Sequence, residues 1–387
     1  MTIIMIGQKG LPARSGGIER HVSLLASGLV AVGHRVIVYG RSWYVGTGKP
    51  PAGVEQKVTR GIHTKHLDAI THTLTALWDA RGEHPDIVHL HGSGVEMLTP
   101  LARFLFPQAK IVFTFHSTNH SLSKWGNFAK AVLRLSERLG CLFADRTIAV
   151  SEVIARYCVK KYGCQATYIP HPFAMPSDQP SVDALADHDL HPNQYLLFVG
   201  RLIQDKQAHL LIQAYQAAKH QRPDLFAEIP LAIIGGGAWT DTYVKWLYQL
   251  AASVPGVQML GERHGEELRS LQAHALGHVF PTSSEGLSIA VLEAGSYRQP
   301  VVITNLPQNR EATGGHAIEV QSQNVQDLSR GLVELAQLSK RDREAKGALF
   351  YHHVRTKFDA ELRVRDMINV YQELLADVSF LPARSIA

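Results

Sequence analysis

The sequence predicts an α/β protein in which two units, each built on a parallel sheet, follow one another along the chain. Three observations predict this class. Short apolar runs typical of strands alternate almost throughout with longer runs of helical periodicity, which is the pattern of parallel sheets covered by helices. The alternation breaks once, in the Pro-, Asp- and Ser-rich residues 170–192, and then restarts. The chain has 387 residues, more than one ordinary domain holds.

The composition indicates two substantial cores and no membrane-spanning segment. Apolar residues make up 45% of the chain, yet no apolar run approaches the roughly 20 residues that a spanning helix needs. A strand-like run begins at Thr2 with no charged or apolar leader before it, so we expect no signal peptide. Cys141, Cys158 and Cys164 have neither metal-ligand spacing nor an even count. We therefore expect a reducing, cytoplasmic compartment and no disulfide framework.

The charge is distributed unevenly along the chain. Residues 1–170 contain 20 Lys and Arg against 10 Asp and Glu, a balance of +10, whereas the remainder contains 19 against 24, a balance of −5. A basic first half suits an anionic surface or substrate. It also suits a protein that is merely kept soluble by its charge, and the sequence leaves both interpretations open.

Residues 125–143 read as a helix in which basic and apolar side chains recur together. This pattern fits a helix that lies on an anionic membrane surface. It also fits an ordinary surface helix with its inner face in the core, which is the interpretation we favour. The basic positions are Lys124, Lys130, Arg134 and Arg138, and the apolar positions are Phe128, Val132, Leu135 and Leu139.

A glycine-rich loop joins the first strand, residues 2–7, to the first helical pattern. Gly10, Gly16 and Gly17 lie between that strand and the helix N-terminus, where backbone amides can approach a phosphate closely. The spacing is not that of the dinucleotide fingerprint, and the second strand, residues 35–39, is followed by a glycine and an arginine rather than an acid. The loop therefore favours a phosphate contact of another kind.

Three histidines mark the further strands expected in the first unit, at residues 86–91, 110–116, 146–151 and 167–170. His89, His91 and His116 lie at or near strand carboxyl ends, where open α/β sheets bind ligands. A zinc site is conceivable, but His89 and His91 share one face of one strand and no carboxylate or cysteine is placed beside them. We expect no metal there. His116 is the one expected to face a cleft, with a buried structural histidine as the alternative.

The second unit opens with a pair of cations at a strand end. Strands are expected at residues 195–200, 231–234, 257–261, 279–281 and 301–305, and helices from residue 207 and over 325–377. Arg201 directly follows the first of these strands, and Lys206 comes five residues later. Two cations opposite a helix start can clamp a diphosphate, Arg by bidentate hydrogen bonds and Lys as a point charge. The alternative is a surface ion-pair element.

Residues 281–300 carry two glutamates that can line one cleft. We expect a helix to begin at Leu287, so that Glu285 precedes it and Glu293 lies roughly two turns inside it. A carboxylate accepts two hydrogen bonds and suits neighbouring sugar hydroxyls, while the free amides of Leu287 and Ser288 suit a phosphate. The alternative is a solvated Glu293, which its apolar neighbours argue against. Sugar, phosphate and ribose in a row describe a nucleotide-sugar.

We expect no metal to hold that diphosphate. The clamp cations are expected to neutralise the phosphates instead.

These motifs together resemble the retaining glycosyltransferases of family 4, which have the GT-B architecture of two Rossmann-like domains with parallel sheets facing across a cleft. The resemblance covers nearly the whole chain, through the glycine loop, the basic pair, the triple glycine and the sequence EGLSIAVLEAGSYRQPVV. The opening IGQKGLPARSGGIERHV is similar to bacterial rhamnosyltransferases of capsule and exopolysaccharide assembly. The chain departs from the family where His171 and Pro172 replace Asn-Gly, and where Gln204 replaces an acid.

The resemblance implies a role for each residue singled out above. Glu293 would take the ribose hydroxyls, Glu285 would hold the hydroxyls of the transferred sugar, and His116 would reach that sugar from the first domain. Gly236, in the triple glycine, would lie in the nucleotide-sugar site. The diphosphate contacts would come from Gly16, Gly17, Arg201, Lys206 and the backbone amides of Leu287 and Ser288.

We therefore predict a membrane-associating hexosyltransferase that moves a sugar from a nucleotide-diphosphate sugar to a glycan or lipid-linked acceptor in cell-surface polysaccharide biosynthesis. The donor is its substrate, and no metal, other cofactor or nucleic acid is expected. The alternatives are a sugar-nucleotide epimerase and a non-catalytic nucleotide-sugar binding protein. The expected domains are an acceptor-binding one at residues 1–172, a nucleotide-sugar-binding one at 173–365, and a helix and tail at 366–387 packing back toward the first.

Overall fold

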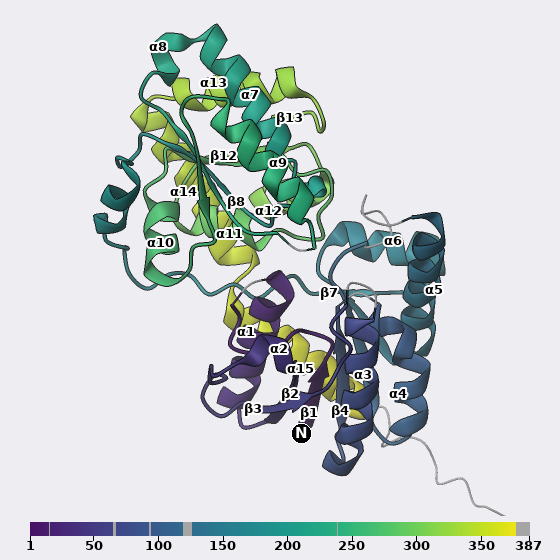
Figure 1. Cartoon of the computed structure of the whole chain (residues 1–387). Coiled ribbons are helices and arrows are strands. Elements are labelled where there is room, and N and C mark those ends of the chain that lie inside the picture. The colour runs from purple at the N-terminus through teal and green to yellow at the C-terminus, as the bar shows by residue number, and fades with distance from the viewer. Residues whose placement is uncertain (15, 65–66, 93, 119–125, 238, 377–387) are drawn as a thin grey trace, which may run out of the picture. The chain divides into compact units, whose positions relative to one another are not determined.

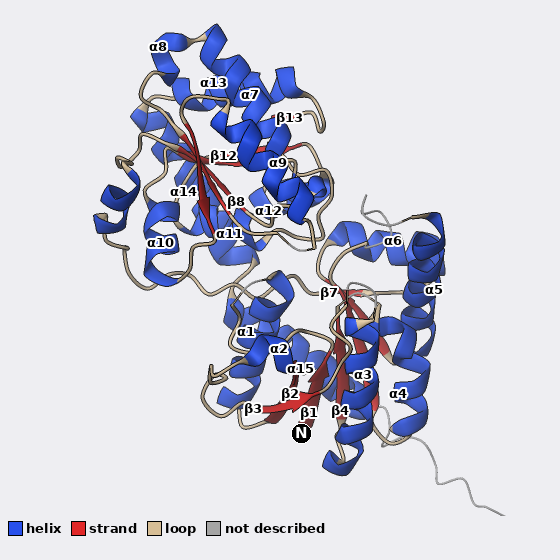
Figure 2. Cartoon of the chain, viewed as in Figure 1, coloured by secondary structure: helices blue, strands red, loops and turns tan. Residues whose placement is uncertain are grey.

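The computed structural model describes residues 1–387 except 15, 65–66, 93, 119–125, 238 and 377–387, and it divides the chain into two compact units (Figure 1). Of the described residues, those within 1–118, 126–174 and 358–376 form the N-terminal unit, and those within 175–357 form the C-terminal unit. Figure 2 shows a sheet with helices on both faces in each unit. The chain thus leaves the first unit close to residue 172 and returns to it somewhat before residue 366.

The N-terminal unit is built on a seven-stranded parallel sheet of order β3-β2-β1-β4-β5-β6-β7. Its central strands are continuous apolar runs because helices cover both faces, and Ile3, Met5 and Val36 are fully buried. The strands are β1 Thr2–Ile6, β2 Arg35–Arg41, β3 Glu55–Thr59, β4 Ile87–His91, β5 Lys110–Phe115, β6 Arg146–Ala149 and β7 Thr167–Tyr168.

A helix from the far end of the chain completes the core of this unit. Leu25 and Leu29 of α1 pack in one cluster with Met367 and Tyr371 of α15, which lies beside α1 in Figure 1. The two helices approach so closely at Gly28 that an added Cβ would lie 2.7 Å from a methyl group of Val364. The helices of the unit are α1 Gly17–Ala31, α2 Ser42–Val45, α3 Asp68–Asp79, α4 Thr99–Leu105, α5 Asn127–Phe143, α6 Glu152–Tyr162 and α15 Ala360–Ala376, with 3-10 turns η1 Ala80–Glu83 and η2 Val95–Leu98.

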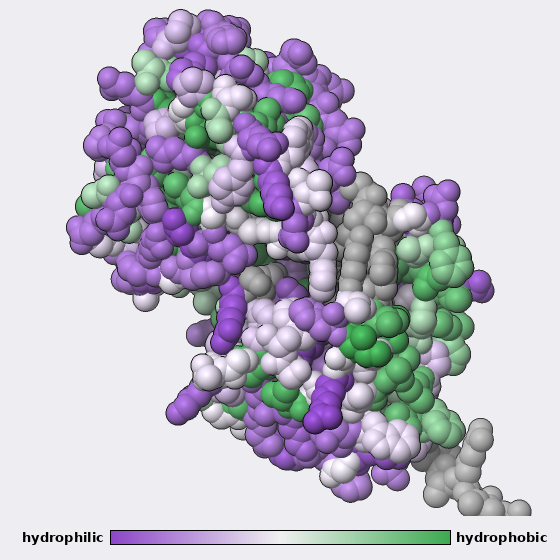
Figure 3. All heavy atoms as spheres, viewed as in Figure 1, coloured by the Kyte–Doolittle hydropathy of each residue, from purple (hydrophilic) through white to green (hydrophobic). Residues whose placement is uncertain are grey.

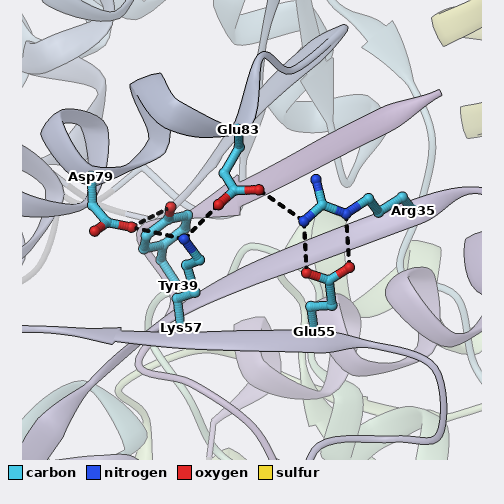
Figure 4. A network of polar contacts seen from close by, with 6 residues as sticks. All are labelled: Arg35, Tyr39, Glu55, Lys57, Asp79 and Glu83. Carbon is cyan, nitrogen blue, oxygen red and sulfur yellow. Dashed lines mark hydrogen bonds and ion pairs between the residues drawn. The ribbon is translucent and has the colours of Figure 1, made fainter.

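Strand β3 was not expected from the sequence because polar side chains hold it at the sheet edge. Figure 4 shows that Arg35 of β2 donates two hydrogen bonds to Glu55 of β3, at 2.8 and 2.9 Å, and a third to Glu83 at 2.8 Å. Lys57 of β3 also contacts Glu83, and Lys57 and Arg35 together lower the pKa of that carboxyl. The edge strand therefore carries charges in place of the apolar alternation that marks a buried strand.

The C-terminal unit has a six-stranded parallel sheet of order β10-β9-β8-β11-β12-β13. Its two faces bury separate apolar clusters, one against α7 and α13 and the other against α10. The short strand β13 was not expected from the sequence. The strands are β8 Leu196–Val199, β9 Leu231–Ile234, β10 Val257–Gly261, β11 Gly277–Phe280, β12 Val301–Thr304 and β13 Ile318–Val320. The helices are α7 Ala208–Gln221, α8 Pro223–Phe226, α9 Asp241–Ala252, α10 Gly265–Ala273, α11 Ile289–Ser296, α12 Pro307–Thr313, α13 Val325–Gln337 and α14 Lys340–Lys357, with 3-10 turns η4 Asp183–His188 and η5 Gln204–Lys206.

Candidate active site

The predicted donor-binding residues of the C-terminal unit follow neighbouring strands of one parallel sheet. Arg201 comes after β8, Gly236 after β9, and Glu285 after β11. Because β8 lies between β9 and β11 and all three run in the same direction, these residues meet at the carboxyl edge of the sheet. That edge is where open α/β folds bind ligands.

An ion pair between Lys206 and Glu285 joins the expected diphosphate clamp to the expected sugar-binding acid. The two side chains are 19% and 11% exposed, so the pair is shielded from most solvent. The sequence had suggested separate tasks for these residues. In the structure they form an ion pair, so a ligand that binds here would contact both side chains or break the pair.

The backbone around this pair is fixed by hydrogen bonds between the turn η5 and the loop after β11. The carbonyl of Asp205 accepts from the amide of Ser283 at 2.9 Å and from the hydroxyl of Thr282 at 3.1 Å. Thr304 of β12 donates its hydroxyl to the carbonyl of Thr282 at 2.6 Å. Lys206 and Glu285 are thus positioned by a braced backbone, as a site that depends on a fixed charge arrangement requires.

Arg201 is exposed and follows β8 at the same edge of the sheet. It forms no ion pair with any residue that the structure describes. A guanidinium at a strand end without a protein partner is available for a phosphate. This observation weakens the alternative in which Arg201 belongs to a surface ion-pair element.

The helix after β11 begins at Ile289, two residues later than the sequence predicted. Ser288 is its N-cap residue, and Glu293 lies only a little over one turn inside rather than two. The apolar run LSIAVL extends across the helix start, and most of its residues are buried both before and after Ile289. Hydrophobicity alone therefore does not locate the first residue of the helix. Within the described part of the chain, the amides of Leu287 and Ser288 donate no hydrogen bond, as a phosphate site would require.

Glu293 is held by a residue that sequence reasoning missed. Gln272 of α10 is almost fully buried, and its amide donates to the Glu293 carboxylate at 2.8 Å. Glu293 itself is half-buried, with Leu292 and Ala294 buried on either side. Nothing in the local sequence of α10 signals this contact, because the two residues meet only through packing of α10 against α11.

Two glycines of the C-terminal unit allow close backbone approach at the same sheet edge. Gly235 has a φ of +151°, and a Cβ added there would lie 1.8 Å from the carbonyl oxygen of Gly200. At Gly236 an added Cβ would lie 2.2 Å from a carboxylate oxygen of Glu262. The triple glycine is therefore needed for close packing, and a ligand that binds there must fit beside these contacts.

The glycine loop of the N-terminal unit leads into α1 as expected. Gly16 is the N-cap residue, with a φ of 101°, and Gly17 is the first residue of the helix. Glu19 lies in the first turn, where its carboxylate accepts the amide of Lys9 at 3.0 Å and leaves no space for a Cβ at Gly16. The carboxylate of Glu19 thus lies against the glycine loop, where the sequence predicted a phosphate contact.

His116 follows β5 and lies in a cluster of histidines. Its ring is 7% exposed and lies near the rings of His21, His91 and His171, with centroid distances of 4.9 to 5.5 Å. Burial lowers the pKa of His116 well below its usual range, and the neighbouring His171 adds to this effect. The ring is therefore neutral, and the residue is almost wholly buried.

The three histidines that lie close together in the structure are not the set His89, His91 and His116 that was considered for zinc from the sequence. Both nitrogens of His89 have partners, Tyr371 at 2.6 Å and Thr114 at 2.7 Å. The third histidine close to His91 and His116 is His21 of α1. The sequence did indicate that His21 is buried, because it shares a helix face with the core residues Val22, Leu25 and Leu29.

Helix α5 presents apolar side chains to solvent. Phe128 is 83% exposed and Leu142 is 67% exposed, whereas the buried positions of the helix are Ser136, Glu137 and Gly140. Figure 3 shows hydrophobic spheres gathered on the side of the N-terminal unit where α4 and α5 lie. We had favoured packing of the apolar face of this helix into the core. Phe128 and Leu142 are instead exposed to solvent. Lys124 and Trp125 lie outside the described residues.

A shallow groove with a volume of about 660 Å³ is lined by residues of α3 and α4. Its lining includes Leu74 and Trp78 of α3 and Leu101 and Leu105 of α4. Among the described residues, no helix is both long enough and apolar enough to cross a membrane.

The two parallel-sheet units define the fold class of this protein. Its structure is similar to that of Anabaena Alr3699/HepE in complex with UDP and glucose, with a TM-score of 0.76 at 16% identity over 96% of this chain and 100% of that one. Two parallel-sheet α/β units of this kind are the GT-B architecture of glycosyltransferases. The GT-B fold expected from the sequence is confirmed.

Family models place both units among the glycosyltransferases. Residues 15–173 match Glycosyltransferase Family 4, and residues 193–337 match Glycosyl transferases group 1. The chain is 26% identical over 182 residues to O-antigen chain mannosyltransferase B of Escherichia coli, a match that spans 47% of this chain and 46% of that protein. It is 26% identical over 347 residues to glycogen synthase of Mycobacterium tuberculosis, spanning 79% and 78%. The chain thus belongs to the GT-B glycosyltransferases of these families.

Proposed function

We propose that this protein transfers a sugar, with retained anomeric configuration, from a nucleotide-diphosphate sugar to a glycan or lipid-linked acceptor in cell-surface polysaccharide biosynthesis. The observation that carries the proposal is the Lys206–Glu285 pair at the carboxyl edge of one sheet, together with Arg201, which forms no ion pair with any described residue at that same edge. Cations suit the diphosphate and the acid suits the sugar attached to it. The relatives include a protein named as an O-antigen chain mannosyltransferase and a neighbour solved with UDP and glucose.

In this mechanism the protein stabilises the departing diphosphate. The bond between the anomeric carbon and the phosphate oxygen breaks, and the acceptor hydroxyl oxygen bonds to the same carbon on the same face. The hydroxyl proton passes to the leaving phosphate oxygen. Arg201, Lys206 and the amides of Leu287 and Ser288 meet the charge that develops on the diphosphate. No metal takes part in this proposal.

The remaining residues hold the donor's two sugars. Glu293, oriented by Gln272, takes the ribose hydroxyls, and Glu285 takes hydroxyls of the transferred sugar. On the N-terminal unit, His116 contacts that sugar, while Gly16 and Gly17 contact the phosphates. Rhamnose is the candidate sugar suggested by the opening motif. Residues 261–267 are candidates for choosing the base, because Glu262 in that loop lies against Gly236.

Acceptor dependence is the experiment that tests this function. A screen of uridine, guanosine and thymidine diphosphate sugars by thermal shift first identifies the donor, since a bound ligand raises the apparent stability. Nucleoside diphosphate release with that donor is then measured with and without a membrane or glycan extract as acceptor. We expect release that rises with acceptor. Release without any acceptor together with an altered sugar would indicate an epimerase, and tight binding without release a non-catalytic protein.

We also propose that the N-terminal unit associates peripherally with the cytoplasmic face of an anionic membrane. The support is the exposed apolar stripe of α5, which carries Arg134 and Arg138 beside Phe128 and Leu142. The doubly substituted Phe128→Ser/Leu142→Ser protein is expected to sediment with anionic vesicles several-fold less at low salt. Leu349→Ser, at a 55% exposed leucine of the C-terminal unit, is the matched control. Wild-type protein that stays in the supernatant would remove the proposal.

A further inference from the structure

A second candidate site lies in the N-terminal unit and is formed by residues of that unit alone. One ring nitrogen from each of His21, His91 and His116 lies within 4.8 Å of the others, and within the described residues this is the only such group of potential metal ligands. His21 belongs to α1, His91 is the last residue of β4, and His116 follows β5. Three separate elements thus converge on one point.

The three rings offer more nitrogen atoms than the surrounding protein satisfies. Nε2 of His21, Nε2 of His91 and Nδ1 of His116 are buried without a hydrogen-bond partner in the described structure. A buried polar atom without a partner is costly, and native structures rarely keep three together. The cluster therefore lacks something that interacts with imidazole nitrogen.

The distances suit a transition metal. Nδ1 of His91 and Nε2 of His116 are 3.3 Å apart, which is long for a hydrogen bond between nitrogens. Two nitrogens bound tetrahedrally to zinc at about 2.0–2.1 Å lie about 3.3–3.4 Å from each other. The observed separation is close to that of two such ligand atoms. These two atoms contact each other and are not the unpartnered nitrogens of the same rings.

A fourth histidine lies against the cluster. His171, whose Nδ1 lies 2.9 Å from Nδ1 of His21, occupies a position from which it can orient that ring.

We propose that His21, His91 and His116 bind one divalent transition-metal ion of the zinc class, with water as the fourth ligand. The ion joins α1 to the carboxyl ends of β4 and β5 and stabilises the N-terminal unit. Imidazole ligands without carboxylates suit zinc, cobalt or nickel rather than magnesium or calcium. The inference goes beyond the proposed transfer reaction. A ring that coordinates through one nitrogen keeps the other, so the proposed sugar contact of His116 is compatible with it.

The test is a titration of metal-free protein with cobalt(II), followed by absorbance and by metal analysis after dialysis. We expect one ion per chain, the visible bands of tetrahedral cobalt, and no thiolate charge-transfer band. Zinc should displace the cobalt and raise the melting temperature. His91→Asn should weaken cobalt binding at least about 10-fold, since even partners of metal ligands contribute this much.

Two controls keep the result specific. His278→Asn, at a fully buried histidine of the C-terminal unit that also has an unpartnered nitrogen, should bind cobalt as the wild type does. Cys141 lies beside Cys158 and Cys164, so a thiolate charge-transfer band would assign the metal to these cysteines and overturn the proposal. If His91→Asn does not fold, His21→Asn replaces it, and the wild-type spectrum alone still separates imidazole from thiolate ligands.

Other outcomes would also overturn the proposal. Wild-type protein that retains no cobalt or zinc at micromolar concentration has no such site. Equal affinity in the wild type, His91→Asn and His21→Asn proteins would place the ion elsewhere. Because nucleotide binding is measured separately by thermal shift, failure of the metal site leaves the proposed function untouched.

Discussion

Lys206→Ala is expected to reduce turnover about 10²-fold or more while leaving the fold intact. The ammonium group meets the charge that develops on the leaving diphosphate, and preorganised charge stabilisers of this kind contribute about that much. Turnover is measured as acceptor-dependent nucleotide release at saturating donor. Arg201→Ala is expected to act in the same direction, because its guanidinium has no partner among the described residues to compete with a phosphate.

The matched control for this substitution is Lys219→Ala. Lys219 also lies in the C-terminal unit, and it donates to the carbonyl of Pro255 at an exposed position. Its removal should leave turnover within about 2-fold of wild type, since surface substitutions away from special features have small effects. Wild-type turnover in both Lys206→Ala and Arg201→Ala would defeat the assignment of the clamp.

The ion pair with Glu285 allows a sharper version of this test. If Lys206 acts only by holding Glu285, then adding Lys206→Ala to a Glu285→Gln protein should change turnover little. If Lys206 neutralises the diphosphate directly, the second substitution should still lower turnover by an order of magnitude or more. A double-mutant cycle over the two residues therefore separates positioning from charge stabilisation.

Gly235→Ala is expected to destabilise the C-terminal unit by about 2–5 kcal/mol. The added methyl carbon would lie 1.8 Å from the carbonyl oxygen of Gly200, and the residue has a φ of +151°. The β8 and β9 ends would have to separate, which would displace Arg201 and Gly236 together. Urea unfolding followed by the fluorescence of Trp246 measures the loss, and the donor thermal shift should fall with it.

A second glycine separates steric clash from backbone strain in this prediction. Gly315 also has a positive φ, +81°, but nothing lies within 4 Å of an added Cβ. Gly315→Ala should therefore cost only the conformational penalty, about 1–2 kcal/mol. Equal effects of the two substitutions would show that the close approach at Gly200 contributes nothing.

Much of the fold was predictable because its signals are local. Buried parallel strands are continuous apolar runs, so most strands were located from sequence to within a few residues. Strand β3 was not found, because Arg35, Glu55, Lys57 and Glu83 hold it by charge instead of apolar burial. The start of α11 was placed two residues early, because the apolar run continues across the helix boundary.

The candidate site was predictable in its components and not in its pairings. Glu285, Lys206 and Arg201 were each identifiable as residues that follow strands, and their convergence follows from the parallel sheet. That Lys206 pairs with Glu285, and that Gln272 orients Glu293, was not visible in the sequence. These contacts depend on side-chain directions at the ends of elements that only packing brings together.

Local patterns along the chain were enough to predict two parallel-sheet units whose candidate ligand-binding residues lie in the loops after the strands. Those patterns are the alternation of buried strands and amphipathic helices, which each segment carries locally. The packing of distant segments is what brings His21 to His91 and His116, and it places α15 in the core of the N-terminal unit. Residues far apart in sequence meet there because the whole chain minimises its exposed apolar surface, and no short segment encodes that outcome alone.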